Sequence, residues 1–345
     1  MDVRLSSEQR ALADSVAQVA GHLGPRTVAA LDDHERAAKL DAAVAAAGWR
    51  DLRTAAAGGP WGSGVEVAIV AEELARASAD TPFIGPTLAA ELRRLAGAPP
   101  ATSAETVLLT SDLGAVAHGG EGGVAVDAAG AESAVVVVPA ASGYTLAAVA
   151  VSSGVATRAS GDDLTRPAVA VAPGTPVSEV AGQSRSISED SLAQWTALGL
   201  ATASADLVGA MRGASDLTVE YARQRRQFGR PIGSFQAVQH LLADAAVHLE
   251  GSRSTALYAA WAVDALPPAD ALGAAAAAKA YTSRAALAVC EIGIQVHGGI
   301  GNTWDCFAHV YLRRSLLAID VLGGVGPNLA RVLEYRGIGG ERGLQ

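Results

Sequence analysis

The chain has little cysteine, few aromatic residues and no excess of positive charge. Its two cysteines, Cys290 and Cys306, are well separated and have no CxxC or HxxxH pattern nearby, which argues against a zinc site and against a disulfide framework. We therefore expect both to be small buried residues. The formal net charge of -9 makes general affinity for nucleic acid unexpected.

Long apolar runs are also missing. No uncharged apolar stretch of about 18 residues with helical spacing occurs, so we expect no membrane-spanning helix. The N-terminus, MDVRLSSEQRALADSV, alternates charged and apolar residues and lacks the apolar core and small-residue cleavage site of a secretory signal. We therefore expect a cytoplasmic protein. A length of 345 residues predicts two or three packed units with a large core.

The first hundred residues have helical patterns. A capping signal at Ser6 or Ser7 precedes an apolar-periodic run to Val19, and residues 65–80 again place apolar side chains at helical spacing. Four prolines then interrupt the pattern: Pro82, Pro86, Pro99 and Pro100.

From about Thr106 the pattern changes to short β-branched runs separated by Gly, Ser, Pro and Asp, which predicts a small antiparallel β-domain. Long helical periods return after about Ser184. We expect helices over residues 191–223, 234–266, 270–295 and 311–319.

The order of helices, strands and helices defines the expected fold class. It argues against a doubly wound sheet and favours a mainly α chain with a middle β-domain. We predict a helical N-terminal domain over residues 1–102, a short β-domain over 103–185 and a C-terminal helical bundle over 186–345.

The stretch RQRRQFGRPIGSFQAVQH, residues 223–240, carries four arginines beside a Gly turn. Guanidinium groups donate two parallel hydrogen bonds to phosphate oxygens and keep their charge, so the cluster suits a phosphate-bearing ligand. A solvated helix end is the alternative.

A second glycine-rich segment, IQVHGGIGNTWD at residues 294–305, directly follows a predicted helix end. Glycines allow positive φ and expose backbone N–H groups, which can line a pyrophosphate. A plain helix stop followed by a turn is the alternative.

Together these segments resemble the acyl-CoA dehydrogenase family, through RRQFGRPIGSFQAVQH at 225–240 and QVHGGIG at 295–301. AEELARASADTPF at 71–83, DLTRP at 163–167 and AHVYLRRS at 308–315 extend the resemblance. It implies a helical N-domain, a β-barrel-like middle domain and a C-terminal four-helix bundle. It further implies a dimer of dimers that binds FAD and an acyl-CoA and passes electrons to an electron-transfer flavoprotein.

The resemblance also implies cofactor-binding residues. Arg225 and Gln236 would contact the FAD pyrophosphate and adenosine region, with Phe228 beside them, in a site that crosses to a neighbouring subunit. The pocket would be completed by Gln295, Val296, His297, Gly298 and Gly299. Arg223, Arg226 and Arg230 are equally well explained as solvated or paired with surface acids.

This chain departs from the family pattern at the position of the catalytic base. The relatives use a glutamate at one of two positions, and these correspond here to Gly323 and Gly199. Glycine cannot accept a proton, so we predict no catalytic residue in this chain. Displaced acids, Asp320 or the pair Glu189 and Asp190, would have to reach the same substrate carbon, which geometry makes demanding.

The middle domain departs as well, because no Trp lies between Trp61 and Trp195, where the family places one against the flavin. The domain is also short. The chain is thus similar to the truncated subunits of actinobacterial heteromeric acyl-CoA dehydrogenases, which act on CoA thioesters of steroid side chains. That similarity implies a paralogous partner subunit that supplies the glutamate.

Three side chains near the glycine-rich segment have simpler interpretations. We expect His297 and His309 to be hydrogen-bonded structural residues, and Trp304 fits a core position better than a ligand stack. Two other functions are compatible with the sequence: a non-catalytic scaffold subunit of the same fold, and a flavin oxidase or hydroxylase relative.

Overall fold

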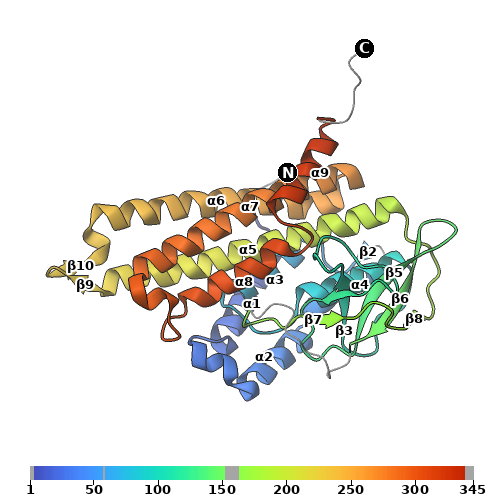
Figure 1. The fold of residues 1–345 in the computed structure, drawn as a ribbon, viewed down its shortest axis with the longest axis horizontal. Coiled ribbons are helices and arrows are strands. Elements are labelled where there is room, and N and C mark those ends of the chain that lie inside the picture. Colours follow the sequence, from blue (N-terminus) through green and yellow to red (C-terminus); the bar gives the residue numbers. More distant parts are fainter. Residues whose placement is uncertain (1–3, 57–58, 152–162, 339–345) are drawn as a thin grey trace, which may run out of the picture.

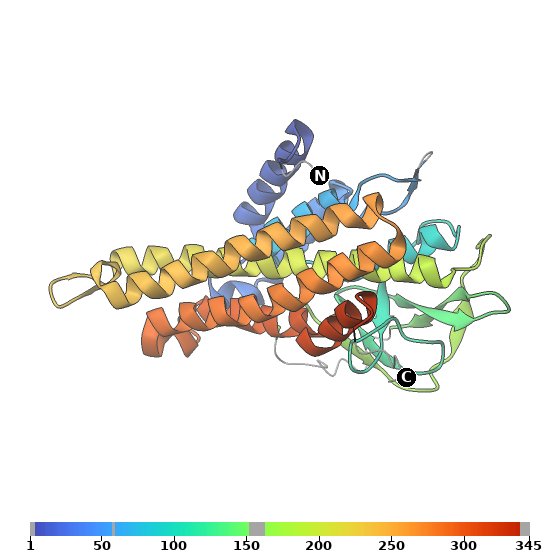
Figure 2. The ribbon, with the colours of Figure 1, turned by 90° about the horizontal axis from the view of Figure 1, so that it is seen from above.

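The structure is a computed structural model that describes residues 4–56, 59–151 and 163–338. The outer ends of the predicted first and third domains, and residues 152–162 of the predicted β-domain, lie outside the described residues. Long helices run side by side along the molecule, with a β-sheet at one end and the N-terminal helices along one side (Figures 1 and 2). The expected fold class, mainly α with a middle sheet, is confirmed.

The N-terminal part contains four α-helices: α1 (Ser7–Leu23), α2 (His34–Ala46), α3 (Gly64–Arg76) and α4 (Ile84–Leu95). Short elements connect them: η1 (Val28–Asp32), η2 (Trp49–Asp51), β1 (Ala55–Ala56) and β2 (Gly59–Pro60). Capping boxes at Ser6 and Ser63 start α1 and α3, as the sequence predicted for α1. Helix α4 was not predicted, because Pro86 was taken as a break although it lies in the first turn, where proline is tolerated.

The sheet has six strands: β3 (Glu105–Leu109), β4 (Gly123–Ala125), β5 (Ser133–Pro139), β6 (Tyr144–Ala150), β7 (Val169–Val171) and β8 (Val177–Glu179). Their order is β7-β4-β3-β5-β6-β8. The prediction of a small antiparallel domain is wrong for the pairing of β3 with β5, which are parallel with Thr106 opposite Ala134. The chain leaves β3, forms β4 on its far side and returns to β5, a crossover that brings the two strands together in parallel.

The C-terminal part begins with α5 (Glu189–Gln224), which leads into a hairpin of β9 (Arg226–Gln227) and β10 (Arg230–Pro231). The remaining elements are η3 (Ile232–Ser234), α6 (Gln236–Ala265), α7 (Pro268–His297), η4 (Gly298–Asn302), α8 (Ala308–Asp320) and α9 (Val325–Tyr335). Helices α5 to α8 match the predicted ranges to within a few residues at most ends. Helix α9 was not predicted, because its apolar pattern is short and begins directly after Gly323 and Gly324.

Glycines allow the helices to approach closely. A Cβ at Gly209 of α5 would lie 2.1 Å from the carbonyl oxygen of Glu72, and one at Gly213 would lie 2.4 Å from that of Arg76. Both carbonyls belong to α3, so α3 and α5 pack backbone against backbone. Buried Trp195 of α5 adds a hydrogen bond from Nε1 to the carbonyl of Leu88 in α4 (2.9 Å). One hydrophobic core therefore includes the N-terminal helices, the sheet and the bundle.

A buried ionic cluster joins the end of the middle segment to the bundle. Arg166 donates to both carboxylate oxygens of Asp206 in α5 (3.1 Å each), and Arg314 of α8 donates to the same carboxylate (2.7 Å). Desolvation lowers the pKa of Arg166, but Asp206, Asp127 and Asp163 outweigh it and raise the pKa above its ordinary value. Each buried charge is therefore compensated.

One segment, Ala308–Tyr335, is long and apolar enough to cross a membrane by length and composition. It is folded here as two helices, α8 and α9, with residues 321–324 between them. A buried helix of a soluble core satisfies the same two criteria, so the segment is weak support for a membrane span.

Candidate functional site

The arginine-rich stretch forms a hairpin at the end of the bundle opposite the sheet (Figure 1). Phe228 (φ 52°) and Gly229 (φ 79°) occupy its two turn positions. Positive φ at both central residues defines a type I′ turn, which matches the twist of the flanking strands. Glycine adopts this conformation easily, whereas phenylalanine does not.

Phe228 is the most exposed large apolar side chain of this region, at 92% of its accessible surface. Its ring meets Phe235 edge-on at 6.1 Å, and the guanidinium of Arg230 lies 4.2 Å from the centroid of Phe235. A bulky residue held at positive φ costs free energy, and such strain clusters at functional sites. The hairpin thus presents an aromatic ring to the outside.

Three guanidinium groups on the hairpin have no acidic partner among the residues that the structure describes. They belong to Arg225, Arg226 and Arg230, and all three residues are exposed. Arg223 approaches Glu220 at 3.9 Å, but both side chains are well exposed, so the pair is weak. The hairpin therefore carries uncompensated positive charge on an acidic protein.

The glycine-rich segment forms the end of α7. Gly298 has φ 68° and ends the helix, and a Cβ at Gly298 or Gly299 would meet nothing within 4 Å. Both glycines and Gln295 are exposed, whereas Val296 is buried. His297 is buried and its Nδ1 lies 2.7 Å from the carbonyl oxygen of Gly293, which agrees with a structural histidine.

A ring stack connects the two segments. Tyr221, one turn before the hairpin, stacks on His297 with centroids 4.3 Å apart and planes at 25°. Both predicted cofactor segments therefore lie at the same end of the bundle (Figures 1 and 2). Sequence analysis missed Tyr221; its only signal is an aromatic residue one helical turn before an arginine cluster.

The two positions predicted to lack the family glutamate, Gly199 and Gly323, are connected through Leu322. Gly199 is buried in α5, and a Cβ there would lie 2.2 Å from Cδ1 of Leu322, the residue before Gly323. Of the displaced candidates, Asp320 and Asp190 are exposed, and Glu189 accepts a hydrogen bond from the Tyr144 hydroxyl (2.9 Å). The three heavy atoms nearest to a Cβ at Gly199 belong to Leu322 and Leu88 and not to any of these acids.

The expectations for His309 and Trp304 are wrong in part. His309 is only 7% exposed, but neither ring nitrogen has a hydrogen-bond partner among the described residues. Burial and the charge of Arg313 lower its pKa. Trp304 is 63% exposed and meets His309 edge-on at 5.1 Å, because the loop before α8 places the indole outside the core.

Lys279, also missed, lies fully buried on α7. Its Nζ donates to the carbonyl oxygens of Ile319 (2.6 Å) and Gly323 (3.2 Å). Burial lowers the pKa of Lys279 to about 7, an effect opposed by the charge of Asp320 and reinforced by that of Arg331. A lone lysine inside the alanine run GAAAAAKAY is the sequence signal that could have identified it.

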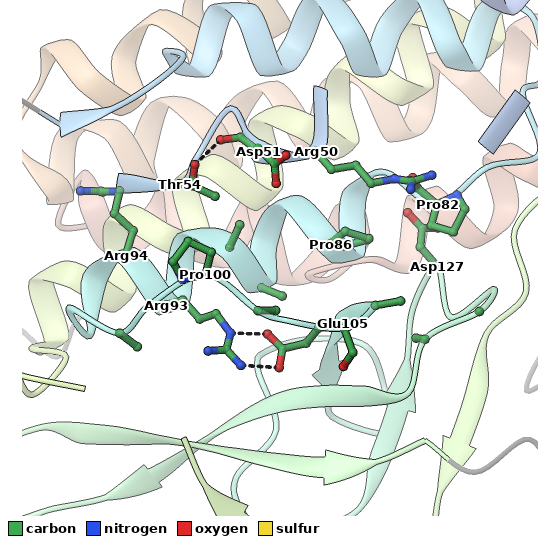
Figure 3. Close-up of a pocket in the computed structure, with 18 of the residues that line it drawn as sticks. Arg50, Asp51, Thr54, Pro82, Pro86, Arg93, Arg94, Pro100, Glu105 and Asp127 are labelled. Atoms are coloured by element: carbon green, nitrogen blue, oxygen red, sulfur yellow. Dashed lines mark hydrogen bonds and ion pairs between the residues drawn. The ribbon is translucent and has the colours of Figure 1, made fainter. Parts of the chain in front are cut away.

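A cavity of about 290 Å³ lies elsewhere, between η2, α4 and the start of the sheet (Figure 3). Its arginines are already paired. Arg93 donates to both oxygens of Glu105 (2.5 and 2.8 Å), Arg94 binds Glu91, and Arg50 binds Asp41. Because these arginines are paired with acids, they are not free to bind a phosphate. None of the predicted cofactor residues lines the cavity.

The cysteines agree with the sequence prediction. Cys290 and Cys306 are free and buried, and burial raises the pKa of the Cys290 thiol to about 11, so it is an unreactive thiol. Within the described ranges, no group of three or more His, Cys, Asp or Glu side chains is arranged to hold a metal ion.

Known proteins resemble this chain in sequence and in fold. The family model for the acyl-CoA dehydrogenase C-terminal domain matches residues 197–325. Acyl-CoA dehydrogenase IpdE2 of Mycobacterium tuberculosis is 34% identical over 322 residues, which cover 89% of this chain and 91% of that protein.

Two solved structures share the fold over nearly the whole chain. The Tcur3481-Tcur3483 steroid ACAD G363A variant aligns with a TM-score of 0.79 at 23% identity, covering 96% of this chain and 98% of that one. The ChsE4-ChsE5 complex from Mycobacterium tuberculosis aligns with a TM-score of 0.76 at 24% identity, covering 98% and 99%. From the extent and identity of the match to IpdE2, the chain belongs to the acyl-CoA dehydrogenase family of FAD-dependent oxidoreductases.

Proposed function

We propose that this chain is one subunit of a heteromeric acyl-CoA dehydrogenase and that it completes an FAD site held mainly by a paralogous partner. The observation that carries the proposal is the hairpin. Within the described part of the chain, its exposed Arg225, Arg226 and Arg230 have no acidic partner, and Phe228 is 92% exposed beside them. A strained, exposed aromatic ring beside unpaired guanidinium groups fits a ligand or surface supplied from outside the chain.

The residues present fit a dinucleotide. Arg225 would donate to the diphosphate oxygens, and Gln236, at the exposed start of α6, would contact the adenosine region with Phe228 beside it. The exposed backbone of Gly298 and Gly299 would close the pocket together with Gln295. Val296 and the stacked His297 fix the position of that turn. When bound, FAD would supply the hydride acceptor for α,β-dehydrogenation of a CoA thioester.

The positions of the acids in this chain support a catalytic base that is supplied by the partner subunit. Gly199 and Gly323 stand where a catalytic glutamate would be needed, while Asp320 is exposed and Glu189 is engaged by Tyr144. Proton removal from the α-carbon needs a carboxylate within hydrogen-bond reach. We therefore assign the catalytic base to the partner subunit and no catalytic residue to this chain.

Substrate and surroundings follow from the relatives by analogy alone. One structural neighbour is titled a steroid ACAD and another is a complex of ChsE4 with ChsE5. We infer a steroid side-chain or branched acyl-CoA as substrate, an electron-transfer flavoprotein as electron acceptor and a cytoplasmic location.

Flavin retention tests the proposal. The chain would be purified alone and after co-expression with an adjacent paralogue, and the ratio of flavin to protein measured from absorbance near 450 nm. We expect little flavin in the lone chain and stable flavin in the assembly. Arg225→Ala should weaken flavin binding about 10- to 100-fold through loss of a charge-assisted hydrogen bond, whereas Arg223→Ala, the matched control, should not.

Unchanged flavin occupancy in an assembled Arg225→Ala complex would contradict the cofactor assignment. Full dehydrogenase activity from the lone wild-type chain would contradict the heteromer. An assembly that never contains flavin would instead support the scaffold interpretation, in which the fold is kept without the cofactor.

A further inference from the structure

The interior around Gly199 is filled by the chain itself. A Cβ built on Gly199 would lie 2.2 Å from Cδ1 of Leu322 and 3.4 Å from both Cδ atoms of Leu88. Leu322 and Leu88 are both fully buried. We call this place, defined by Gly199, Leu88 and Leu322, the Gly199 site. The missing side chain of Gly199 is thus replaced by the end of Leu322, which comes from the turn between α8 and α9.

Leu322 reaches the Gly199 site in an unfavourable backbone conformation. Its φ is 58°, in the left-handed region that a leucine rarely adopts. Its N–H donates to the carbonyl oxygen of Leu113 in the sheet domain (2.7 Å), and its own carbonyl accepts from Nη1 of Arg331 (2.7 Å). The surrounding structure therefore holds the strained residue from two sides.

The rest of the 321–324 turn is held equally firmly. Lys279 Nζ donates to the carbonyl oxygens of Ile319 and Gly323. Buried Asn328 donates through Nδ2 to the carbonyl oxygens of Gly323 (2.6 Å) and Gly324 (2.9 Å). Side chains from α7 and α9 thus fix the turn with Leu322 pointing inward.

We propose that Leu322 is an internal plug that closes the Gly199 site to the acyl group of a CoA thioester, so that acyl-CoA is bound in the partner subunit alone. The inference rests on the proposed function, because the family resemblance places the reacting carboxylate at Gly199 or beside Leu322. The inference goes beyond the absence of a carboxylate, because it states that the side chain of Leu322 fills the Gly199 site.

A double-mutant cycle tests the packing. Gly199→Ala should lower the Tm of the full chain by roughly 4 °C through overpacking against Leu322. Leu322→Ala should remove that clash, so the double variant should be more stable than the sum of the single changes requires. Gly21→Ala, at a helical glycine with nothing within 4 Å, is the control and should not lower the Tm. Additive changes, or a neutral Gly199→Ala, would overturn the plug.

Photo-crosslinking tests the closure. Dodecanoyl-CoA with a diazirine at the end of its acyl chain would be irradiated with the assembled complex, and labelled peptides identified by mass spectrometry. We expect label on partner peptides and none on peptides of this chain that contain Leu88, Gly199 or Leu322. Label on those peptides would refute the proposal. Neither test reads flavin, so a failed flavin assignment and a failed plug are distinguishable.

Discussion

At the scale of single residues, the candidate site depends on side chains whose conformation has a cost. Phe228 takes a turn position that favours glycine or asparagine and remains 92% exposed. Within the isolated chain the ring keeps an edge-on contact with Phe235, and we expect a further contact in the proposed assembly to offset the cost of the strained backbone. The unpaired guanidinium groups beside it indicate the same.

Tyr221 connects the two predicted cofactor segments, because its ring stacks on His297 with the centroids 4.3 Å apart. Tyr221→Ala should detach the hairpin from the glycine turn and reduce flavin retention of the assembly about 10-fold, since stacking contacts contribute about 0.5–1.5 kcal/mol beyond their buried area. Tyr221→Phe keeps the ring and should restore retention. If both variants lose flavin equally, or neither does, stacking is not the cause.

At the scale of elements, much of the helical part was predictable. Capping signals and apolar periods predicted α1, α3 and the long helices α5, α6 and α7, because these features are local. Pro86 concealed α4, and the parallel pairing of β3 with β5 depends on a crossover that no local pattern encodes. We propose domain boundaries near residues 102 and 185, where α4 gives way to the sheet and the sheet to α5.

Lys279 connects α7 to the turn between α8 and α9. Its buried amine should make the free energy of unfolding of the chain depend on pH. Its folded pKa of about 7 lies below the ordinary value of 10.5, so above pH 7 the unfolded chain binds more protons than the folded one. Stability should therefore rise with pH between about 7 and 10.5, by at most about 1.4 kcal/mol per pH unit from this group. Urea unfolding of the wild type and of Lys279→Met across this range would measure it.

The expected result is a shallower rise for Lys279→Met, because methionine does not titrate, with the variant least stable relative to the wild type at high pH, where the neutral amine still donates to the carbonyl of Ile319. Lys39→Met, at an exposed lysine, should follow the wild-type slope. Parallel slopes for all three proteins would show that Lys279 is not a buried neutral amine.

At the scale of the whole molecule, residues that are far apart in the sequence contact one another in the fold, and sequence patterns do not predict these contacts. Motif resemblance predicted Arg225 and the Gln295–Gly299 segment as cofactor-binding, and this stays a prediction. The Tyr221 stack, the position of Leu322 against Gly199 and the contacts of Lys279 required the fold. The buried cluster of Arg166, Asp206 and Arg314 joins the segment before β7 to the bundle. The hairpin lies at the far end of the bundle, where we propose that another chain binds.

A structure of the chain assembled with its paralogue and FAD tests this account most directly, through the distance from the Arg225 guanidinium to the dinucleotide diphosphate. We predict a separation of about 2.7–3.2 Å, with the flavin held mainly by the partner and Gly298–Gly299 lining the same pocket. A hairpin that faces bulk solvent, remote from any bound flavin, would contradict the account.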